Sequence, residues 1–267
     1  MTEARDGGAL PDIDTIRARW RRWRKRQLLA DLDAEDFGHG GLARLIPDRT
    51  SRLLILPSDP ETHLVDLDEE IWDWWASEFD DPATGEQTRW GRNRLPTAAA
   101  AVFGDDYGER GWRRYIALHR SGALEVGFGR DGSVVHDEQR YFFLGSIVAR
   151  CWAAIERYRE VIERFDLQAP HELSLALVET EGALLGGFAE GWAEPDRLEY
   201  VTHPCRESNI LIRRACPVWP DEDEQSKAVA LSLGAQIEDA WSAQQRRFLA
   251  NRGEFEGQFD PRPARWH

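Results

Sequence analysis

The chain is poor in cysteine and methionine and has no long apolar segment. Its 267 residues include three cysteines, Cys151, Cys205 and Cys216, and a single methionine. An odd number of widely separated cysteines argues against a secreted disulfide framework, so we expect a reducing compartment. No apolar run approaches the roughly 18 residues that a membrane span needs, and the polar segment Met1 to Pro11 lacks a signal-peptide core. We therefore expect a cytoplasmic protein without membrane contact.

The usual short motifs of catalysis and cofactor binding are also missing. No Gly-x-Ser-x-Gly elbow occurs, and the glycines between 182 and 187 lack the Gly-Lys-Ser/Thr ending of a phosphate-binding loop. His203, Cys205 and Cys216 are poorly spaced for zinc and lack a fourth ligand. Glu125 and the other abundant carboxylates are best interpreted as solvated surface. We therefore predict no cofactor and no metal, and we favour a protein that is not an enzyme.

The overall charge restricts the partners that the chain can have. Hydrophobic residues make up 42% of the sequence and charged residues 31%, which is typical of a packed globular fold. The formal net charge of −14 argues against a surface built throughout for phosphate backbones or anionic lipid. Any contact with nucleic acid must therefore be local.

One basic segment, Arg17 to Arg26, stands out against this acidic background, with seven Arg or Lys in ten residues. Ile13, Ile16, Trp20 and Trp23 recur at helical steps, which predicts an amphipathic helix running to about residue 29. The candidate residues for binding a partner protein or nucleic acid are Arg17, Arg19, Trp20, Arg21, Arg22, Trp23, Arg24, Lys25 and Arg26.

Three interpretations of this helix stay open. Both tryptophans share a stripe, so the helix could pack on its own core with solvated or ion-paired arginines around it, and we weigh this interpretation first. The same arginines could instead dock an acidic protein surface. In the third interpretation they bond phosphates while the interleaved indoles stack on bases.

Periodicity elsewhere predicts an α+β fold with a mainly antiparallel sheet built from hairpins. Strands are expected at 51–57, 112–119, 123–128, 172–178 and 209–213. Further helices are expected at about 69–79, 144–165 and 225–248. We expect a loop over 80–96, a strand or a helix start over 97–103, and a second hairpin around the glycines at 182–187.

In this fold the two long amphipathic helices, 144–165 and 225–248, cover one face of the sheet, and the basic helix precedes it. We expect an N-terminal segment over 1–95, an α+β core domain over 96–248 and a polar tail over 249–267. A single domain over 12–248 is the alternative.

Three stretches carry a family resemblance: Tyr115 to Val126, Glu172 to Ala183 and Asn209 to Trp241, in that order around the helix at 144–165. Together they resemble the C-terminal region of bacterial Schlafen-like proteins that carry an Alba-type domain assigned to DNA binding. The resemblance is best over 115–241 and extends loosely back to Arg17. No segment here looks like the Alba-type domain, to which the family's nucleic-acid chemistry is attributed, so no functional residue carries over. The resemblance implies a free-standing accessory module beside a separate effector.

The leading functional hypothesis is therefore a non-catalytic accessory, adaptor or sensor subunit that binds a protein partner, in a bacterial DNA-associated or phage-defence system. Its contact would use the basic helix and an exposed patch of Trp72, Trp74, Trp75 and Trp90. The first alternative is a nucleic-acid-binding protein that uses the basic helix. The second is a hydrolase whose site assembles scattered His and carboxylate groups.

Overall fold

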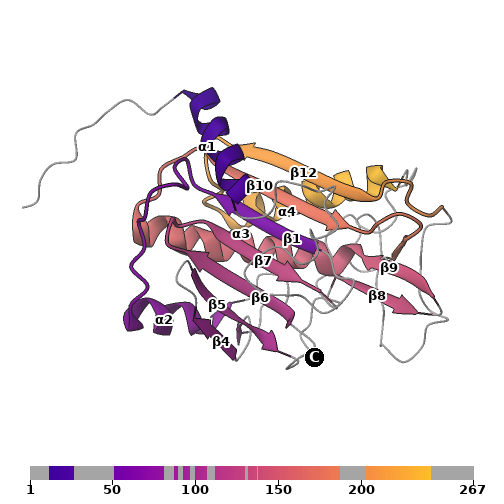
Figure 1. The fold of residues 1–267 in the computed structure, drawn as a ribbon, viewed down its shortest axis with the longest axis horizontal. Coiled ribbons are helices and arrows are strands. Elements are labelled where there is room, and N and C mark those ends of the chain that lie inside the picture. Colours follow the sequence, from indigo (N-terminus) through magenta and orange to yellow (C-terminus); the bar gives the residue numbers. More distant parts are fainter. Residues whose placement is uncertain are drawn as a thin grey trace, which may run out of the picture.

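The computed structural model describes residues 12–26, 51–80, 87–89, 93–96, 100–106, 112–129, 132–136, 138–186 and 203–241 (Figure 1). The helices are α1 (Ile13–Arg26), α2 (Glu69–Ala76), α3 (Leu144–Phe165) and α4 (Asp223–Ala240). The strands are β1 (Ser51–Leu56), β2 (Phe79–Asp80), β3 (Gln87–Thr88), β4 (Asn93–Pro96), β5 (Ala100–Asp106), β6 (Trp112–His119), β7 (Leu124–Phe128), β8 (Ser133–His136), β9 (Gln139–Phe143), β10 (His171–Val178), β11 (Leu184–Gly186) and β12 (Asn209–Cys216).

A seven-stranded antiparallel sheet organises the fold. Its strand order is β12-β10-β1-β7-β6-β5-β4. Two smaller sheets pair β2 with β3 and join β11, β9 and β8, and the β11–β9 pair is parallel. The predicted α+β class with a mainly antiparallel sheet is therefore confirmed.

Both faces of this sheet are apolar, as strand β1 shows most directly. Every residue of β1 is buried, and successive side chains of a strand point to opposite faces. Leu53 and Ile55 belong to the main core with α3 and α4, whereas Leu54 and Leu56 belong to a second core under α1. Figure 1 shows α3 behind the strands and α1 in front of them. Helices thus lie on both faces, which corrects the expectation that they cover one face only.

Helix α3 crosses the back of the sheet and supplies much of the main core. Its 22 residues carry an apolar stripe at helical steps, and the stripe residues Ile147, Cys151, Ile155 and Tyr158 are buried. The helix ends where Asp166 adopts a left-handed conformation with φ 49°. The predicted stripe residues Val229, Leu233 and Ile237 of α4 are buried too. Helix α4 ends at Ala240, before the bound of 248 expected from the sequence, so the buried Trp241 follows it and Phe248 lies outside the described residues.

The segment expected to be a loop over 80–96 contains three short strands, β2, β3 and β4. Their residues lack a strand pattern, but each strand gains its hydrogen bonds from a partner: β4 pairs with β5, and β2 pairs with β3. Such pairing overrides weak local propensity. Pro96 is accommodated because β4 is the edge strand of the main sheet.

Within the described residues up to Gly186, the glycines at 182 and 186 do not form the expected hairpin. Strand β11 pairs in parallel with β9, more than forty positions earlier in the chain, with Leu184 opposite Tyr141. A hairpin that the sequence did not predict joins β8 to β9, and Glu138 in its turn has φ 63°. Of the segment 97–103, expected as a strand or a helix start, the described residues 100–103 belong to strand β5.

The main sheet draws strands from both sides of the domain boundary expected at residue 95. Strand β1 lies between β10 and β7, and β4 itself runs from Asn93 to Pro96. The sheet therefore does not divide at residue 95. The expected tail over 249–267 lies outside the described residues. Within the described part of the chain, no helix has the length and apolar character needed to cross a membrane.

Candidate functional site

The two tryptophans of the basic helix are core residues. Trp20 is fully buried, Trp23 is 4% exposed, and both pack on the apolar face formed by Leu54, Leu56 and neighbouring strands. The Trp20 indole Nε1 donates a hydrogen bond of 2.7 Å to the Pro57 carbonyl oxygen. The proposed role of Trp20 and Trp23 in contacting a partner or stacking on bases is therefore incorrect, because the indoles anchor α1 to the sheet.

The arginines of α1 point outward and lie among carboxylates. Arg17 and Arg21 are exposed, and Arg17 lies 3.5 Å from Asp14. Arg19 and Arg22 pair across to residues that follow β1, with 3.2 Å separating Arg19 from Asp59 and Arg22 from Glu61. The side chains of Arg24, Lys25 and Arg26 lie outside the described ones.

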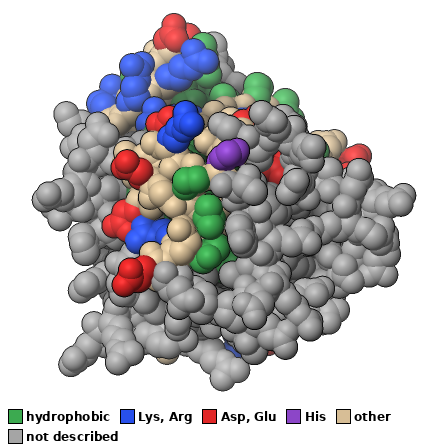
Figure 2. Space-filling view, turned by 90° about the vertical axis from the view of Figure 1, so that its right-hand side faces the viewer, with side chains coloured by type: hydrophobic (Ala, Val, Ile, Leu, Met, Phe, Trp, Pro, Cys, Tyr) green, Lys and Arg blue, Asp and Glu red, His purple; other side chains and the backbone are tan. Residues whose placement is uncertain are grey.

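We call this region the α1 surface, defined by Asp14, Arg17, Arg19, Arg21, Arg22, Asp59 and Glu61. Figure 2 shows Lys and Arg side chains gathered at the top of the molecule, the end that α1 occupies in Figure 1, with acidic side chains among them. The hydrogen bond and the negative charge of Glu61 raise the pKa of Arg22. The surface is basic but mixed in sign.

Substituting Trp20 by phenylalanine should lower the free energy of unfolding by about 2 kcal/mol, because the buried Pro57 carbonyl loses its donor. Chemical unfolding would measure the loss. Ile13→Ala is the matched control in the same helix, since Ile13 is 41% exposed and its truncation should change stability by less than about 0.5 kcal/mol. Equal effects of the two substitutions would show that the indole hydrogen bond does not anchor α1.

The expected exposed patch of tryptophans does not form among the described residues. Trp72 and Trp75 are buried in the main core, and Trp74 is half-buried against it. Trp90 lies outside the described part of the chain. The sequence analysis expected an exposed partner surface made from Trp72, Trp74 and Trp75. This expectation is incorrect, because these side chains pack in or against the main core.

Beneath α1, sequence reasoning missed a buried polar network centred on Glu125. The carboxylate accepts a hydrogen bond from the Tyr115 hydroxyl at Oε1, and its Oε2 lies 3.2 Å from His119 Nε2. Tyr115 is fully buried, and His119 and Glu125 are each 3% exposed. The ring of Trp23 meets the His119 ring edge-on at 5.1 Å between centroids, so the network lies directly under the basic helix.

Strand register alone assembles this network. Tyr115, Ala117 and His119 alternate along β6 and therefore share one face of the sheet. Glu125 lies opposite Ala117, whose small side chain leaves room for Tyr115 and His119 to reach the carboxylate from either side. Gly127 lies opposite Tyr115, and the phenol ring rests on it. The signal was present in the hairpin sequence, but it becomes visible only once the register is known.

Arg52 from β1 supplies a positive charge to the same network. Burial alone would raise the pKa of Glu125, but the hydrogen bond with His119, the charges of His119 and Arg52 and the Tyr115 hydrogen bond hold it below its ordinary value. Burial raises the pKa of Tyr115 well above the usual range, and the Arg52 charge opposes that rise. Glu125 is thus an ionised carboxylate inside the protein.

This network is better suited to hold the sheet and α1 together than to react with a solute. Both oxygens of Glu125 already contact donors of the chain, and Arg52, Tyr115, His119 and Glu125 are at most 4% exposed. A general base needs an accessible proton donor within hydrogen-bond reach, and the chain's own groups fill that position here. The assignment of Glu125 to solvated surface is therefore incorrect.

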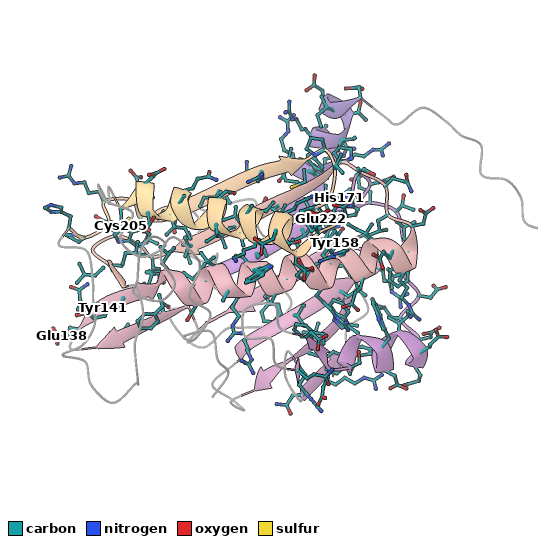
Figure 3. The ribbon with its side chains drawn as sticks, turned by 180° about the vertical axis from the view of Figure 1, so that it is seen from behind. Glu138, Tyr141, Tyr158, His171, Cys205 and Glu222 are labelled. Carbon is teal, nitrogen blue, oxygen red and sulfur yellow. The ribbon has the colours of Figure 1, made fainter. Side chains whose placement is uncertain are left out.

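A second buried group, His171, lies between Tyr158 and Trp219, with ring centroids 5.5 and 5.3 Å away. Burial lowers the pKa of His171 to about 4, so the imidazole is neutral near pH 7. His171 pairs with Cys216 across β10 and β12, and Figure 3 shows His171 and Cys205 near opposite ends of α4. Cys205 and Cys216 are therefore not brought together.

No group of three or more His, Cys, Asp or Glu side chains that could hold a metal ion occurs in the described part of the chain. Comparisons of the chain with protein-family models, with curated proteins and with solved structures found no match. The resemblance to the C-terminal region of Schlafen-like proteins therefore stays a prediction.

Proposed function

We propose that this chain is a non-catalytic adaptor that binds an acidic segment of a partner protein through the α1 surface. The observation that carries the proposal is the anchoring of α1 by Trp20 and Trp23, which leaves the arginines on the outer face of a fixed helix. The resemblance adds the expectation of a bacterial DNA-associated or phage-defence system, in which the chain serves a separate effector.

Anchoring matters because binding is opposed by the ordering of flexible groups. The helix backbone is already fixed on the sheet, so only the outer arginine side chains lose freedom when a partner docks. Arginine is also enriched in protein interfaces, where its planar group bonds carboxylates with two parallel hydrogen bonds. Arg22 already shows this mode toward Glu61, with Nε 3.3 Å from Oε1 and Nη2 3.2 Å from Oε2.

Nucleic acid is the alternative partner, and two features of the α1 surface disfavour it. Trp20 and Trp23 are buried, so they offer no rings for bases to stack on. Asp14, Asp59 and Glu61 lie beside the arginines and would repel phosphate groups. These carboxylates would also repel a uniformly anionic segment, so we expect the acidic segment to carry some cations that meet them, which a phosphate backbone cannot do.

Among the described residues, the hydrolase alternative can draw on the contact between His119 and Glu125. Both residues are buried, and both oxygens of Glu125 already contact hydrogen-bond donors of the chain, which favours a structural role. The adaptor proposal therefore has the stronger support.

The test is a double charge reversal, Arg17→Glu with Arg21→Glu, which leaves the Arg19 and Arg22 ion pairs in place. The partner would be isolated with the wild-type chain from its native host, purified separately and titrated by calorimetry. We expect the double variant to bind at least about tenfold more weakly, because two interfacial charges are reversed. Arg206→Glu with Arg94→Glu makes the same charge change at exposed positions outside the α1 surface and should bind like wild type.

Two outcomes would contradict the adaptor proposal. One is a wild-type chain that elutes alone from native extract at every salt concentration. The other is tight binding of labelled DNA or RNA at low salt, with a salt dependence that flattens in the Arg17 and Arg21 double variant, because that result identifies phosphate contacts.

A further inference from the structure

Strand β12 forms a long edge of the main sheet. It pairs with β10 along its whole length, from Asn209 to Cys216, and no other described strand pairs with it. Figure 1 shows β12 along the upper border of the sheet. In an antiparallel ladder about half of the residues in an edge strand direct their N–H and C=O groups away from the neighbouring strand. Such a row of backbone groups is a template on which an extended segment can add.

The two edges of the main sheet differ in how they are protected against strand addition. Proteins usually blunt an edge by making the strand short, by a proline, by a bulge or by charged side chains. Strand β4, at the opposite edge, has four residues and ends in Pro96, which has no backbone N–H to donate. Strand β12 has eight residues, contains no proline and keeps an unbroken register with β10. Its protection is limited to the charges of Arg213 and Arg214.

These two arginines point to opposite faces of the sheet, because side chains alternate along a strand. Arg214 is half-buried and donates to the Ser232 hydroxyl of α4, so its charge is already used within the fold. Arg213 is exposed on the other face, where Leu211 packs against the core beneath α1. Partial burial lowers the pKa of Arg213, and no carboxylate in the described part of the chain opposes this effect. Arg213 is thus a cation that a carboxylate of another molecule can meet.

Exposed apolar side chains lie close to Arg213 in the chain. Ala215 is exposed on the same face of β12 as Arg213. Just beyond the strand, Val218 is 80% exposed, the highest exposure among the large hydrophobic side chains that the structure describes. The edge therefore offers a cation and apolar surface in addition to its backbone groups.

The arginines also argue against a second copy of this chain as the partner. Antiparallel pairing of two β12 strands brings Arg213 and Arg214 of both copies together near the middle of the strands. Like charges that face each other across paired strands are destabilising, whereas opposite charges stabilise the pair. A strand that places a carboxylate opposite Arg213 is therefore the better match for this edge.

We propose that the outer edge of β12 binds an extended acidic segment of a partner protein, which adds to the main sheet as an eighth strand. The backbone of the segment pairs with the outward N–H and C=O groups of 209–216, and its carboxylates face Arg213. Strand addition of this kind draws affinity from main-chain hydrogen bonds and specificity from alternate side chains. The inference goes beyond the α1 proposal and does not rest on it, because β12 lies outside the α1 surface.

The test uses a fluorescein-labelled peptide of four Thr-Glu repeats, titrated by anisotropy at low salt. Arg213→Glu should weaken binding at least about tenfold, because an attraction becomes a repulsion. Arg94→Glu makes the same charge change at an exposed position on β4, the opposite edge strand, and should stay within about twofold of wild type. Arg213→Gln provides a milder second variant, and thermal unfolding checks that each chain is folded.

The peptide backbone separates strand addition from simple charge attraction. The same peptide N-methylated at two adjacent central residues keeps its charge but cannot pair along either edge, so it should bind at least about tenfold more weakly. The unmodified peptide should also slow amide hydrogen exchange in 209–216, because outward N–H groups that were open to water become hydrogen-bonded.

Three results with the peptide would overturn the inference. Wild type that does not bind it leaves the edge without an acidic ligand. Equal affinity for the N-methylated peptide shows that the backbone of the segment does not pair with β12. Equal weakening by Arg213→Glu and Arg94→Glu shows attraction to positive charge in general.

Two further results would assign the binding elsewhere and would also overturn it. If the Arg17 and Arg21 double variant loses the peptide while Arg213→Glu keeps it, the peptide binds on the α1 surface. If the chain dimerises without peptide and the dimer protects the amides of 209–216, the edge belongs to a second copy. A native partner that is indifferent to the Arg17 and Arg21 reversal contradicts the α1 proposal but leaves the peptide results on β12 unaffected.

Discussion

Replacing Gly127 by alanine is expected to lower the free energy of unfolding by about 3 kcal/mol. Alanine inside a strand normally stabilises relative to glycine by roughly 0.5–1 kcal/mol, so the sign here is reversed. A Cβ at this position would lie 2.8 Å from Cζ of Tyr115 and would overlap the phenol ring, which rests on the glycine. The ring cannot move aside easily, because its hydroxyl is bonded to Glu125. Urea unfolding of the purified chain would measure the loss.

The companion measurement places Gly127→Ala in a Tyr115→Ala background. Without the ring, the added methyl meets open space, and alanine should then be neutral or slightly stabilising. The two substitutions would therefore show a coupling of about 3 kcal/mol in a double-mutant cycle. If Gly127→Ala costs the same in both backgrounds, the glycine serves the backbone and not the phenol ring.

Local patterns were sufficient wherever an element carries its own periodicity. The apolar stripe of 144–165 predicted α3 at its observed bounds, and the alternation on either side of Gly122 predicted the β6–β7 hairpin. Gly122 has φ 77°, as the turn required. These elements depend on contacts between residues close in sequence, which is why a single sequence reveals them.

Long-range pairing was beyond such reasoning. Strand β1 lies between β10 and β7, and β11 pairs with β9. Nothing in the local sequence of these strands indicates which strand each pairs with. The short strands β2, β3 and β4 have weak propensity and exist because neighbours supply their hydrogen bonds. Gly127 lies inside β7 under Tyr115, and its local sequence gives no sign of that close approach.

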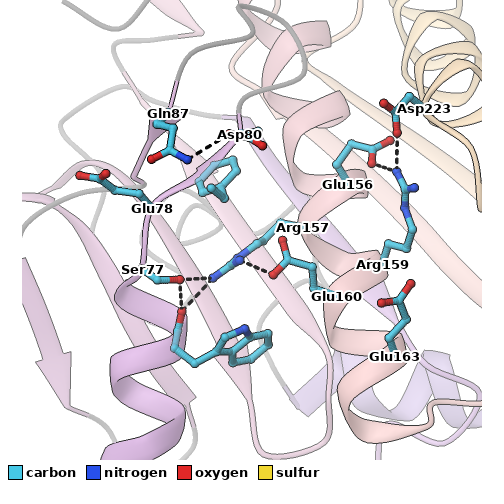
Figure 4. A pocket seen from close by; sticks show the side chains of 12 residues that line it. Ser77, Glu78, Asp80, Gln87, Glu156, Arg157, Arg159, Glu160, Glu163 and Asp223 are labelled. Atoms are coloured by element: carbon cyan, nitrogen blue, oxygen red, sulfur yellow. Dashed lines mark hydrogen bonds and ion pairs between the residues drawn. The ribbon is translucent and has the colours of Figure 1, made fainter.

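The same limit applied to the functional residues. The stripe of Trp20 and Trp23 indicated a packed helix, and the structure places both in a core. The sequence could not show that this core covers Glu125, because a carboxylate between apolar residues on a hairpin is usually solvated. Only the register of β6 and β7 brings His119 and Tyr115 to it. A pocket of about 650 Å³ lined by Trp74, Arg157 and Asp223 likewise combines residues from α2, α3 and α4, which no local pattern connects (Figure 4).

Removing the Glu125 carboxylate should have the largest effect on stability. Glu125→Ala leaves the Arg52 charge, the Tyr115 hydroxyl and His119 buried without their common partner, and breaking a buried ion pair in this way costs about 3–5 kcal/mol. Glu125→Gln keeps the shape and one acceptor, so its loss should be smaller. Urea unfolding at pH 7 would measure both, with Glu181→Gln as the control at an exposed carboxylate.

The pH dependence separates the charge of Glu125 from its packing. Because the folded chain holds the pKa of Glu125 below its ordinary value of 4.5, ionised Glu125 stabilises the fold above that pH. As the pH falls below 4.5 toward the folded pKa, the carboxylate takes up a proton and that contribution is lost. The stability difference between wild type and Glu125→Gln should therefore be greatest near pH 7 and shrink in acid. A difference that stays constant from pH 7 to pH 3 would mean that the carboxylate stabilises the sheet by shape alone, and that Arg52 and His119 do not need its charge.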